Sequence, residues 1–179
     1  MRPIGTTVIL LVLMCLLAAL SQAQAPMPKP APELKNLEYF AGAWTSEGDV
    51  KPGPMGPGGK FTGHDVNEWM PGGFFLTSHD KFSGVFGEGT GIAFMGYNPD
   101  DKVYTYDAFN SMGERESAKG TMDGDTWTYT SDEHFGGQLM KGRYSMKVLS
   151  PTSYNFKFEI SQDGSNWTTV MDGKATKSK

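Results

Sequence analysis

Apolar and polar residues alternate along much of the chain after about residue 44. The clearest case is the segment 154–160, where Tyr154, Phe156, Phe158 and Ile160 are each separated by one polar residue. A period of two places every second side chain on the same face of a β-strand. This segment is therefore predicted to be a strand with one face in a core and the other in water. The segment 140–148 shows the same pattern.

Comparable segments recur to the end of the chain, separated by short clusters of Gly, Pro, Asn and Asp. The connections at 98–101, 123–125 and 163–166 have the composition of tight turns, and short turns join antiparallel neighbours. We predict about ten strands, at residues 44–50, 60–70, 74–81, 90–97, 103–110, 114–122, 126–131, 138–149, 153–162 and 167–175. A meander of this size leaves two open edges unless the sheet closes on itself. The predicted fold class is thus all-β, an antiparallel meander β-barrel, and a barrel of this size generally encloses a cavity.

The residues before the first strand follow a different period. Leu34, Leu37 and Phe40 have the spacing of one face of a short helix, which is predicted to cap one end of the barrel. Gly42 and Trp44 follow, and we predict that Phe40, Gly42 and Trp44 close that end. Arg143 is predicted to lie over the Trp44 ring in a cation–π contact. The glycine-rich segments 51–59 and 83–89, the second containing Val85 and Phe86, would then rim the opposite mouth.

The N-terminus has the three parts of a secretory signal peptide. Arg2 supplies the positive charge, Val8 to Leu20 form an almost unbroken apolar run, and Ser21 to Ala23 offer a cleavage site. The run is shorter than the roughly 18 residues that a retained membrane anchor needs. The predicted organisation is a signal peptide at 1–23, a proline-rich spacer at 24–32 and a barrel domain at 33–177. We therefore expect an exported protein with no integral membrane segment in the mature chain.

Cysteine content and charge narrow the functional classes further. The sole cysteine, Cys15, lies inside the predicted signal peptide, so the mature chain would have no disulfide, thiolate metal site or cysteine nucleophile. Without Arg2 the chain carries 15 basic and 20 acidic residues, a net charge of −5, and no basic cluster. Nucleic acid is therefore not an expected partner.

Several short motifs resemble, in their order, the exported bacterial proteins of domain of unknown function 1579. They are residues 40–44, 72–76, 89–98 and 106–113, and the resemblance spans nearly the whole mature chain. It implies a calycin-like barrel, similar to lipocalins, fatty-acid-binding proteins and nitrobindins, and the family has no assigned reaction. Gly42 and Trp44 match the lipocalin pattern that opens the first strand. The haem-binding relatives use a histidine near the chain end, which residues 167–179 lack, so haem is not expected.

No catalytic or metal-binding group of residues stands out. His64 and His79 could form a metal site with Glu68 or Asp80, but alternation places His64 with Val66, Glu68 and Met70, and His79 with Phe75 and Thr77. Surface histidines are the better interpretation, and no metal site is predicted; His134 is expected in a loop. The acidic pairs at 100–101 and 132–133 fall in predicted turns, where solvated carboxylates are common. The sequence does not decide whether the protein is an enzyme, but it favours a protein without catalytic activity.

The leading hypothesis is a barrel that binds a small apolar or amphipathic molecule in its interior, without chemistry and without a cofactor. The alternative is a structural or protein-interaction domain with a filled core. If the barrel is hollow, aromatic and methionine side chains are the expected lining, because both suit adaptable apolar sites. The predicted lumen residues are Trp69, Met95, Tyr106, Tyr144, Phe156 and Phe158, with His64 or Tyr104 as polar partners.

Overall fold

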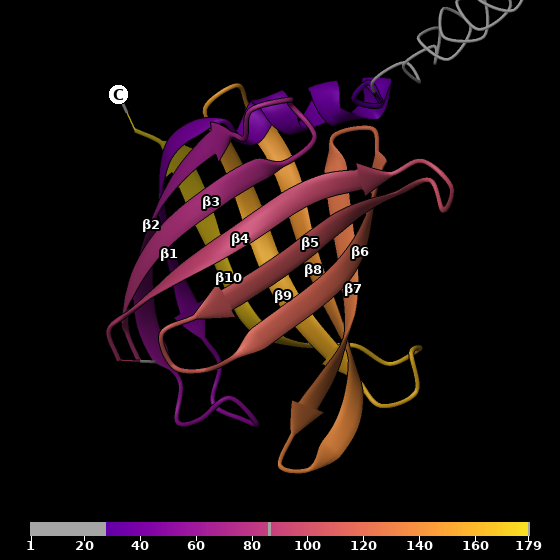
Figure 1. Ribbon diagram of the computed structural model, residues 1–179. Coiled ribbons are helices and arrows are strands. Elements are labelled where there is room, and N and C mark those ends of the chain that lie inside the picture. Colours follow the sequence, from indigo (N-terminus) through magenta and orange to yellow (C-terminus); the bar gives the residue numbers. More distant parts are fainter. Residues whose placement is uncertain (1–27, 86, 179) are drawn as a thin grey trace, which may run out of the picture.

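The computed structural model describes residues 28–85 and 87–178. Ten antiparallel strands form one closed barrel in which each strand pairs with its neighbours in sequence, and β1 pairs with β10 (Figure 1). The predicted all-β meander barrel is confirmed. The elements are the 3-10 helix η1 (Pro32–Phe40) and the strands β1 (Gly42–Val50), β2 (Gly59–Trp69), β3 (Leu76–Gly84), β4 (Gly89–Asn98), β5 (Val103–Asn110), β6 (Arg115–Asp123), β7 (Thr126–Phe135), β8 (Gln138–Ser150), β9 (Ser153–Ser161) and β10 (Thr168–Lys177).

Two glycines face each other where the first and last strands close the barrel. Gly48 of β1 pairs with Gly173 of β10. A Cβ atom on Gly173 would lie 2.3 Å from the carbonyl oxygen of Glu47 and 2.5 Å from the Phe156 ring. The backbone and an inward-facing ring occupy the space that any larger residue would need. The absence of side chains therefore permits this close approach of the two strands.

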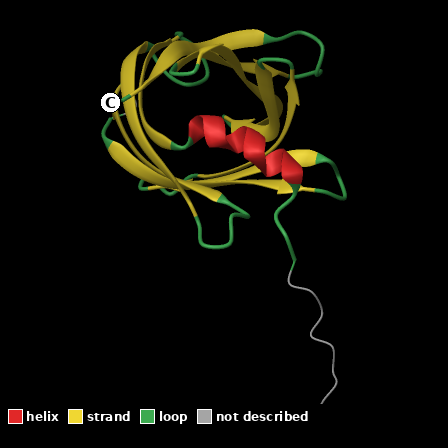
Figure 2. Ribbon diagram, turned by 90° about the horizontal axis from the view of Figure 1, so that it is seen from above, coloured by secondary structure: helices red, strands yellow, loops and turns green. Residues whose placement is uncertain are grey.

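The helix η1 lies across one end of the barrel, as the view from above shows (Figure 2). Pro32 is at its start, where a missing backbone N–H costs no helical hydrogen bond. Leu34, Leu37 and Phe40 are all at most 5% exposed and point into the barrel. Because their apolar surface is removed from water against the strand ends, η1 closes this end.

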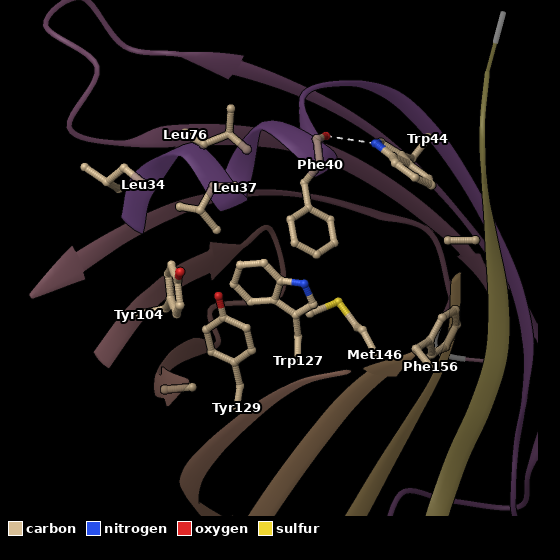
Figure 3. Packing of buried hydrophobic residues seen from close by; sticks show 12 residues of the cluster. Leu34, Leu37, Phe40, Trp44, Leu76, Tyr104, Trp127, Tyr129, Met146 and Phe156 are labelled. Carbon is tan, nitrogen blue, oxygen red and sulfur yellow. Dashed lines mark hydrogen bonds between the residues drawn. The ribbon is translucent and has the colours of Figure 1, made fainter. Parts of the chain in front are cut away.

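Trp44 begins the core beneath the helix. Its side chain is buried, and its indole Nε1 donates a 2.8 Å hydrogen bond to the carbonyl oxygen of Phe40 (Figure 3). The Phe40 ring makes an edge contact with the ring of Trp127 at a centroid distance of 5.2 Å. The chain turns at Gly42, whose φ of +97° is unfavourable for other residues, and this turn brings Trp44 back to the carbonyl oxygen of Phe40.

The largest error in the predicted strand boundaries concerns β7. The prediction ended this strand at Ser131 and placed His134 in a loop, whereas β7 continues to Phe135, which pairs with Gln138 of β8. Gly136 and Gly137 both have positive φ, at 58° and 81°, and form the two-residue turn. This glycine pair was the signal for a longer hairpin, and the acidic residues before it were misread as loop.

The predicted signal peptide at 1–23 lies outside the described residues, as does Phe86. Residues 28–31 of the predicted spacer precede η1 without regular secondary structure. In the described part of the chain, no helix has the length and apolar character needed to cross a membrane.

Candidate functional site

A cavity of about 270 Å³ lies inside the barrel, beneath the cap. Phe40 of η1 forms part of its wall at the capped end. The strands contribute the rest, because every second side chain of a barrel strand points inward. The lining strand residues are Ser46, Phe61, Asp65, Asn67, Ser78, Met95, Tyr106, Glu116, Tyr129, Tyr144, Met146, Tyr154, Phe156 and Met171.

One side of the cavity is aromatic. Tyr144 of β8 stacks on Phe156 of β9, with centroids 5.8 Å apart and planes inclined by 20°. Tyr154 and Phe61 both contact the same Phe156 ring, at 6.4 Å and 6.0 Å. The register explains the cluster, since Phe156 of β9 pairs with Met146 of β8, and Met146 is in phase with the inward-facing Tyr144. Four rings from β2, β8 and β9 thus form one continuous apolar surface.

Another part of the inner wall is polar and lies on β2 and β3. Asp65 pairs directly with Asp80, and Asn67 pairs with Ser78. Asp65, Asn67 and Ser78 line the cavity, and Asp80 shares the inward face with them. In an antiparallel pair, directly opposed side chains lie about 5 Å apart. The two carboxyl groups are therefore close neighbours inside the barrel.

Burial shifts the acid–base equilibria of these carboxyl groups. Loss of hydration, reinforced by the charge of Asp80, raises the pKa of Asp65 from 3.8 to about 6. Burial also raises the pKa of Glu116 on β6 to about 7, with Glu133 and Glu114 adding to the effect. The pKa of Asp80 is raised by burial as well, although its own backbone N–H and the nearby His79 oppose the shift. The carboxyl groups of Asp65 and Glu116 therefore change protonation near neutral pH.

Four tyrosines also face the cavity, and burial raises the pKa of each of them: Tyr106, Tyr129, Tyr144 and Tyr154. After burial, the pKa of Tyr106 is raised further by the charges of Glu116, Asp80 and Asp65, in that order. All three carboxyl groups are therefore within electrostatic reach of one phenol. The phenols stay protonated and keep their hydrogen-bonding capacity.

Several of these polar groups have no partner within the part of the chain that the structure describes. Asn67 donates from Nδ2 to the carbonyl oxygen of Phe40 at 2.8 Å, but its Oδ1 accepts no hydrogen bond. The buried hydroxyl of Tyr129 is also unpaired. The carboxyl groups of Asp65 and Glu116 form no hydrogen bond or ion pair with any described residue. Such groups lose hydration without compensation from the protein itself.

The sequence of residues 29–177 matches the family model described as "Protein of unknown function (DUF1579)". This chain belongs to the DUF1579 family. No curated protein matches it in sequence.

Solved structures show that the DUF1579 barrel shares its fold with distant proteins. The crystal structure of Rv2717c from M. tuberculosis superposes with a TM-score of 0.58 at 12% identity, covering 84% of this chain and all of that one. The S-type phycobiliprotein lyase CPES from Guillardia theta superposes with a TM-score of 0.54 at 11% identity, covering 81% of this chain and 92% of that one. At these identities the likeness extends to the fold alone. The calycin-like barrel that the sequence motifs implied is therefore confirmed.

Four of the eight predicted lumen residues line the cavity of this DUF1579 barrel: Met95, Tyr106, Tyr144 and Phe156. Phe158 pairs with Tyr144 on the inward face of β9 but is not part of the cavity wall. Tyr104 and Trp69 belong to the cap instead. The Tyr104 hydroxyl donates to the carbonyl oxygen of Glu33 at 3.1 Å, and the Trp69 indole donates to Glu38 at 2.7 Å.

His64 was predicted as a polar partner in the lumen, and that prediction is wrong. Asp65 faces inward, so His64 on the adjacent position of β2 faces outward and is exposed. His79 is likewise exposed on β3. Among the residues that the structure describes, no cluster of His, Cys, Asp and Glu could hold a metal ion.

The predicted contact between Arg143 and Trp44 is also wrong. The guanidinium of Arg143 lies 4.0 Å from the centroid of the Trp167 ring and pairs with Glu159 at 2.9 Å. Arg143 pairs with Glu159 across β8 and β9, one position out of phase with the inward Tyr144, and thus lies on the outer surface. Lys177 takes the predicted place, with its ammonium 5.4 Å from the centroid of Trp44.

The sequence interpretation missed the polar wall because it did not fix the phase of β2 and chose lumen residues from both faces, Trp69 and His64. It placed His64, Val66 and Met70 on one face and did not identify that face as the outer one. Val66 and Met70 are 36% and 41% exposed. Phe61 and Trp69 lie in phase with Asp65. These two aromatic residues were the signal that the odd-numbered positions face inward.

Proposed function

We propose that this DUF1579 protein binds a small amphipathic molecule inside the barrel and does not transform it. The observation that carries the proposal is the cavity of about 270 Å³, with an aromatic surface on one part of its wall and unpaired polar groups on another. Ligand pockets start at roughly 300 Å³ and combine an apolar lining with a few polar groups that fix orientation. A bound molecule with one apolar and one polar part satisfies both surfaces.

The unpaired groups favour this proposal over the alternative of a filled-core interaction domain. A core that serves only stability gains from apolar contacts and loses free energy for each buried polar group without a partner. Within the described residues, the Oδ1 atom of Asn67 and the hydroxyl of Tyr129 carry that cost. A ligand that hydrogen-bonds to them recovers it, which gives the cavity a function that a filled core lacks.

Access to the cavity is proposed at the end away from the cap. Leu37 and Trp44 at the capped end are at most 1% exposed, and Phe40 covers the cavity there. The connection 51–58 lies at the opposite end (Figure 1), as do Val85, Gly87 and Glu88 between β3 and β4. Glycine-rich connections rearrange at low cost. A ligand would therefore enter between these loops.

The apolar run from Val8 to Leu20 supports a further proposal, that the mature chain is exported. A binding protein in that compartment would meet its ligand outside the cytoplasm. N-terminal sequencing of the mature protein after expression in a secreting host tests this, and a chain that retains Met1 would contradict it.

The neutral fluorophore 6-propionyl-2-dimethylaminonaphthalene tests whether the interior binds a ligand. Its emission shifts to the blue when it leaves water, and its elongated naphthalene body resembles the proposed ligand class. We expect saturable binding by the purified protein. The variant Ser78→Leu places a larger apolar side chain in the cavity and is expected to weaken binding at least tenfold.

The matched control is Ser145→Leu, which makes the same substitution on β8 in phase with the outer surface. It should bind the fluorophore as the unmodified protein does. Circular dichroism verifies that both variants retain the barrel. Equal binding by the two variants would place the fluorophore on the outer surface and overturn the proposal. Absence of saturable binding by the unmodified protein would overturn it as well.

A further inference from the structure

At Asp65 and Asn67 on β2 and at Glu116 on β6 the cavity presents acceptors, whereas the donors that line it are the neutral hydroxyls of serine and tyrosine side chains. Asp65 and Glu116 present carboxyl groups, and the free atom of Asn67 is the carbonyl oxygen Oδ1. An ionised carboxylate and an amide oxygen only accept hydrogen bonds. The missing partner must therefore be a donor.

Positive charge from the protein does not meet these acceptors. No Lys, Arg or His lines the cavity within the described residues. Among the described strand residues, Lys177 is the one basic residue in phase with the inner face of its strand, opposite Trp44. Its ammonium is engaged at the cap by the carbonyl oxygen of Tyr39 and the ring of Trp44. The interior carboxyl groups thus lack a counter-ion in the part of the chain that the structure describes.

We propose that the ligand is an organic cation, an amine or amidine carried on an aromatic or aliphatic body, whose charged end binds at Asp65 and Asn67 in the cavity that Glu116 also lines. This inference rests on the proposed function and specifies its ligand class. An ammonium has three donors and no acceptor. It therefore complements this wall, whereas a carboxylate would meet like charge.

Asn67 supplies evidence that does not depend on the acidic residues. It is 7% exposed, and its Nδ2 is held by the carbonyl oxygen of Phe40 at 2.8 Å. This hydrogen bond fixes the amide so that Oδ1 is the atom left without a partner in the cavity wall. Residues 65 and 67 are in phase on β2, so Oδ1 lies on the same inner face as the Asp65 carboxyl group. An amide oxygen and a carboxylate side by side bind an ammonium more tightly than either alone.

The aromatic surface also suits a cation. Tyr144, Tyr154 and Phe156 form a cluster of rings within the same cavity. Ring faces attract cations, and this attraction strengthens when water is excluded. The same rings accept the apolar body of the ligand. A neutral molecule would gain the apolar contact with the rings but not the attraction between ring faces and a cation.

The proposed binding depends on pH in a defined direction. Asp65 and Glu116 are partly protonated near pH 6–7, because their pKa values are raised to about 6 and about 7. A bound cation favours their ionised forms, so binding releases protons and strengthens as pH rises from 5 to 8. The other ionisable groups that face the cavity or act on these two are Asp80 on β3, Tyr106 on β5, Tyr129 and Glu133 on β7, Tyr144 on β8 and Tyr154 on β9, with Glu114 before β6.

Three indoles of matched size test the charge preference by isothermal titration calorimetry. Tryptamine carries an ammonium, 3-ethylindole is neutral and indole-3-propionate carries a carboxylate. We expect tryptamine to bind at least tenfold more tightly than 3-ethylindole at pH 8, and indole-3-propionate to bind most weakly. Titration at pH 6 in two buffers of different ionisation enthalpy should show proton release with tryptamine and none with 3-ethylindole.

Isosteric variants identify the residues. Asp65→Asn and Glu116→Gln remove charge with little change of shape and should each weaken tryptamine at least fivefold while leaving 3-ethylindole unchanged. Asp107→Asn is the control, because Asp107 pairs with Ser117 in outward phase on β5. The readout with 3-ethylindole also reports whether a variant has kept its cavity.

Equal affinity for tryptamine and 3-ethylindole would overturn the cationic ligand while supporting an interior binding site. Tighter binding of indole-3-propionate than of tryptamine would also overturn the cationic ligand while supporting an interior binding site. If none of the three binds and the neutral fluorophore also fails, the proposed function falls together with this inference. If the three fail while the fluorophore binds in the cavity, only the cationic ligand is overturned.

Discussion

Asp65 on β2 lies directly opposite Asp80 on β3, and both carboxyl groups belong to the inner face of the barrel. Like charges in directly opposed positions of a sheet are destabilising, and the low polarity of the interior increases the cost. The barrel tolerates this because protonation can neutralise the pair. The pKa of Asp65 is accordingly raised, first by burial and then by Asp80.

This relationship predicts that the barrel loses stability as pH rises. The pKa of Asp65 is about 6 in the folded chain against 3.8 as its ordinary value, and that of Glu116 is about 7 against 4.5. Below pH 3.8 both carboxyl groups are mostly protonated in the folded and in the unfolded chain, so burying them costs no ionisation free energy. Between about pH 4 and 7 the unfolded chain releases these protons first, so the free energy of unfolding falls. Asp65→Asn should therefore stabilise the protein at pH 7.5 by on the order of 2 kcal/mol.

Urea denaturation of the unmodified protein and Asp65→Asn at pH 4.5, 6 and 7.5 measures the effect. The difference between the two should grow with pH. Asp107→Asn, in outward phase on β5, controls for the loss of one charge and should show no such trend. A difference that is constant with pH would show that Asp65 is not shifted in the folded state.

The fold could be predicted because its signals are local. Alternation in 153–162, turns such as 163–166 and the Leu34, Leu37, Phe40 spacing each depend on a few neighbouring residues. The end of β7 could not be placed because Asp132 and Glu133 resemble a loop when read alone. Only pairing with β8 shows that they belong to a strand.

The site was harder to predict because it depends on the phase of each strand. In β9 the apolar residues fix the phase, and Phe156 was correctly placed on the inner face. In β2 both faces contain polar residues, so the phase was ambiguous and Asp65 was overlooked while His64 was chosen. A polar cavity wall removes the hydrophobic signal on which the phase assignment relies.

Trp44 is predicted to stabilise the capped end through both packing and its hydrogen bond. Trp44→Phe keeps an aromatic ring but removes the Nε1 donor to the carbonyl oxygen of Phe40 and leaves unfilled volume. We expect a loss of about 2 kcal/mol in the free energy of unfolding. Guanidinium denaturation measures it. Trp69→Phe is the matched control, because its indole bonds to the exposed Glu38, and it should cost about 1 kcal/mol or less. Equal losses would show that the bond to Phe40 adds nothing.

Gly173 is predicted to be required for closure between β1 and β10. In Gly173→Ala the new methyl group would meet the carbonyl oxygen of Glu47 at 2.3 Å and the ring of Phe156 at 2.5 Å. The strands must separate locally, at a cost of about 2–3 kcal/mol. Hydrogen exchange should accelerate at the amides of β1 and β10. Lys174→Ala alters the next, exposed position and should leave exchange unchanged; the same acceleration in both variants would exclude a steric cause.

Arg143 is predicted to stabilise the outer surface of β8 and β9 through two partners. Its guanidinium lies over Trp167 and pairs with Glu159, a carboxylate that is 6% exposed and also pairs with Lys157. Burial opposes ionisation of Glu159, but its hydrogen bonds with Lys157 and Arg143 outweigh that effect and lower its pKa. Arg143→Met leaves this buried charge with one partner, and we expect a loss of about 1–2 kcal/mol at pH 7.

The loss in Arg143→Met should shrink as pH falls below the ordinary range of a glutamate, because protonation of Glu159 removes the unpaired charge. Arg143→Lys keeps the charge but not the planar group that lies over Trp167, so its loss should be intermediate. The control is Lys147→Met, which breaks a solvent-exposed pair with Asp125 and should leave the free energy of unfolding nearly unchanged. Urea denaturation at pH 3.5 and pH 7 distinguishes these cases. If Arg143→Met and Lys147→Met have equal effects at both pH values, the cluster of Arg143, Trp167 and Glu159 is no stronger than an ordinary surface ion pair.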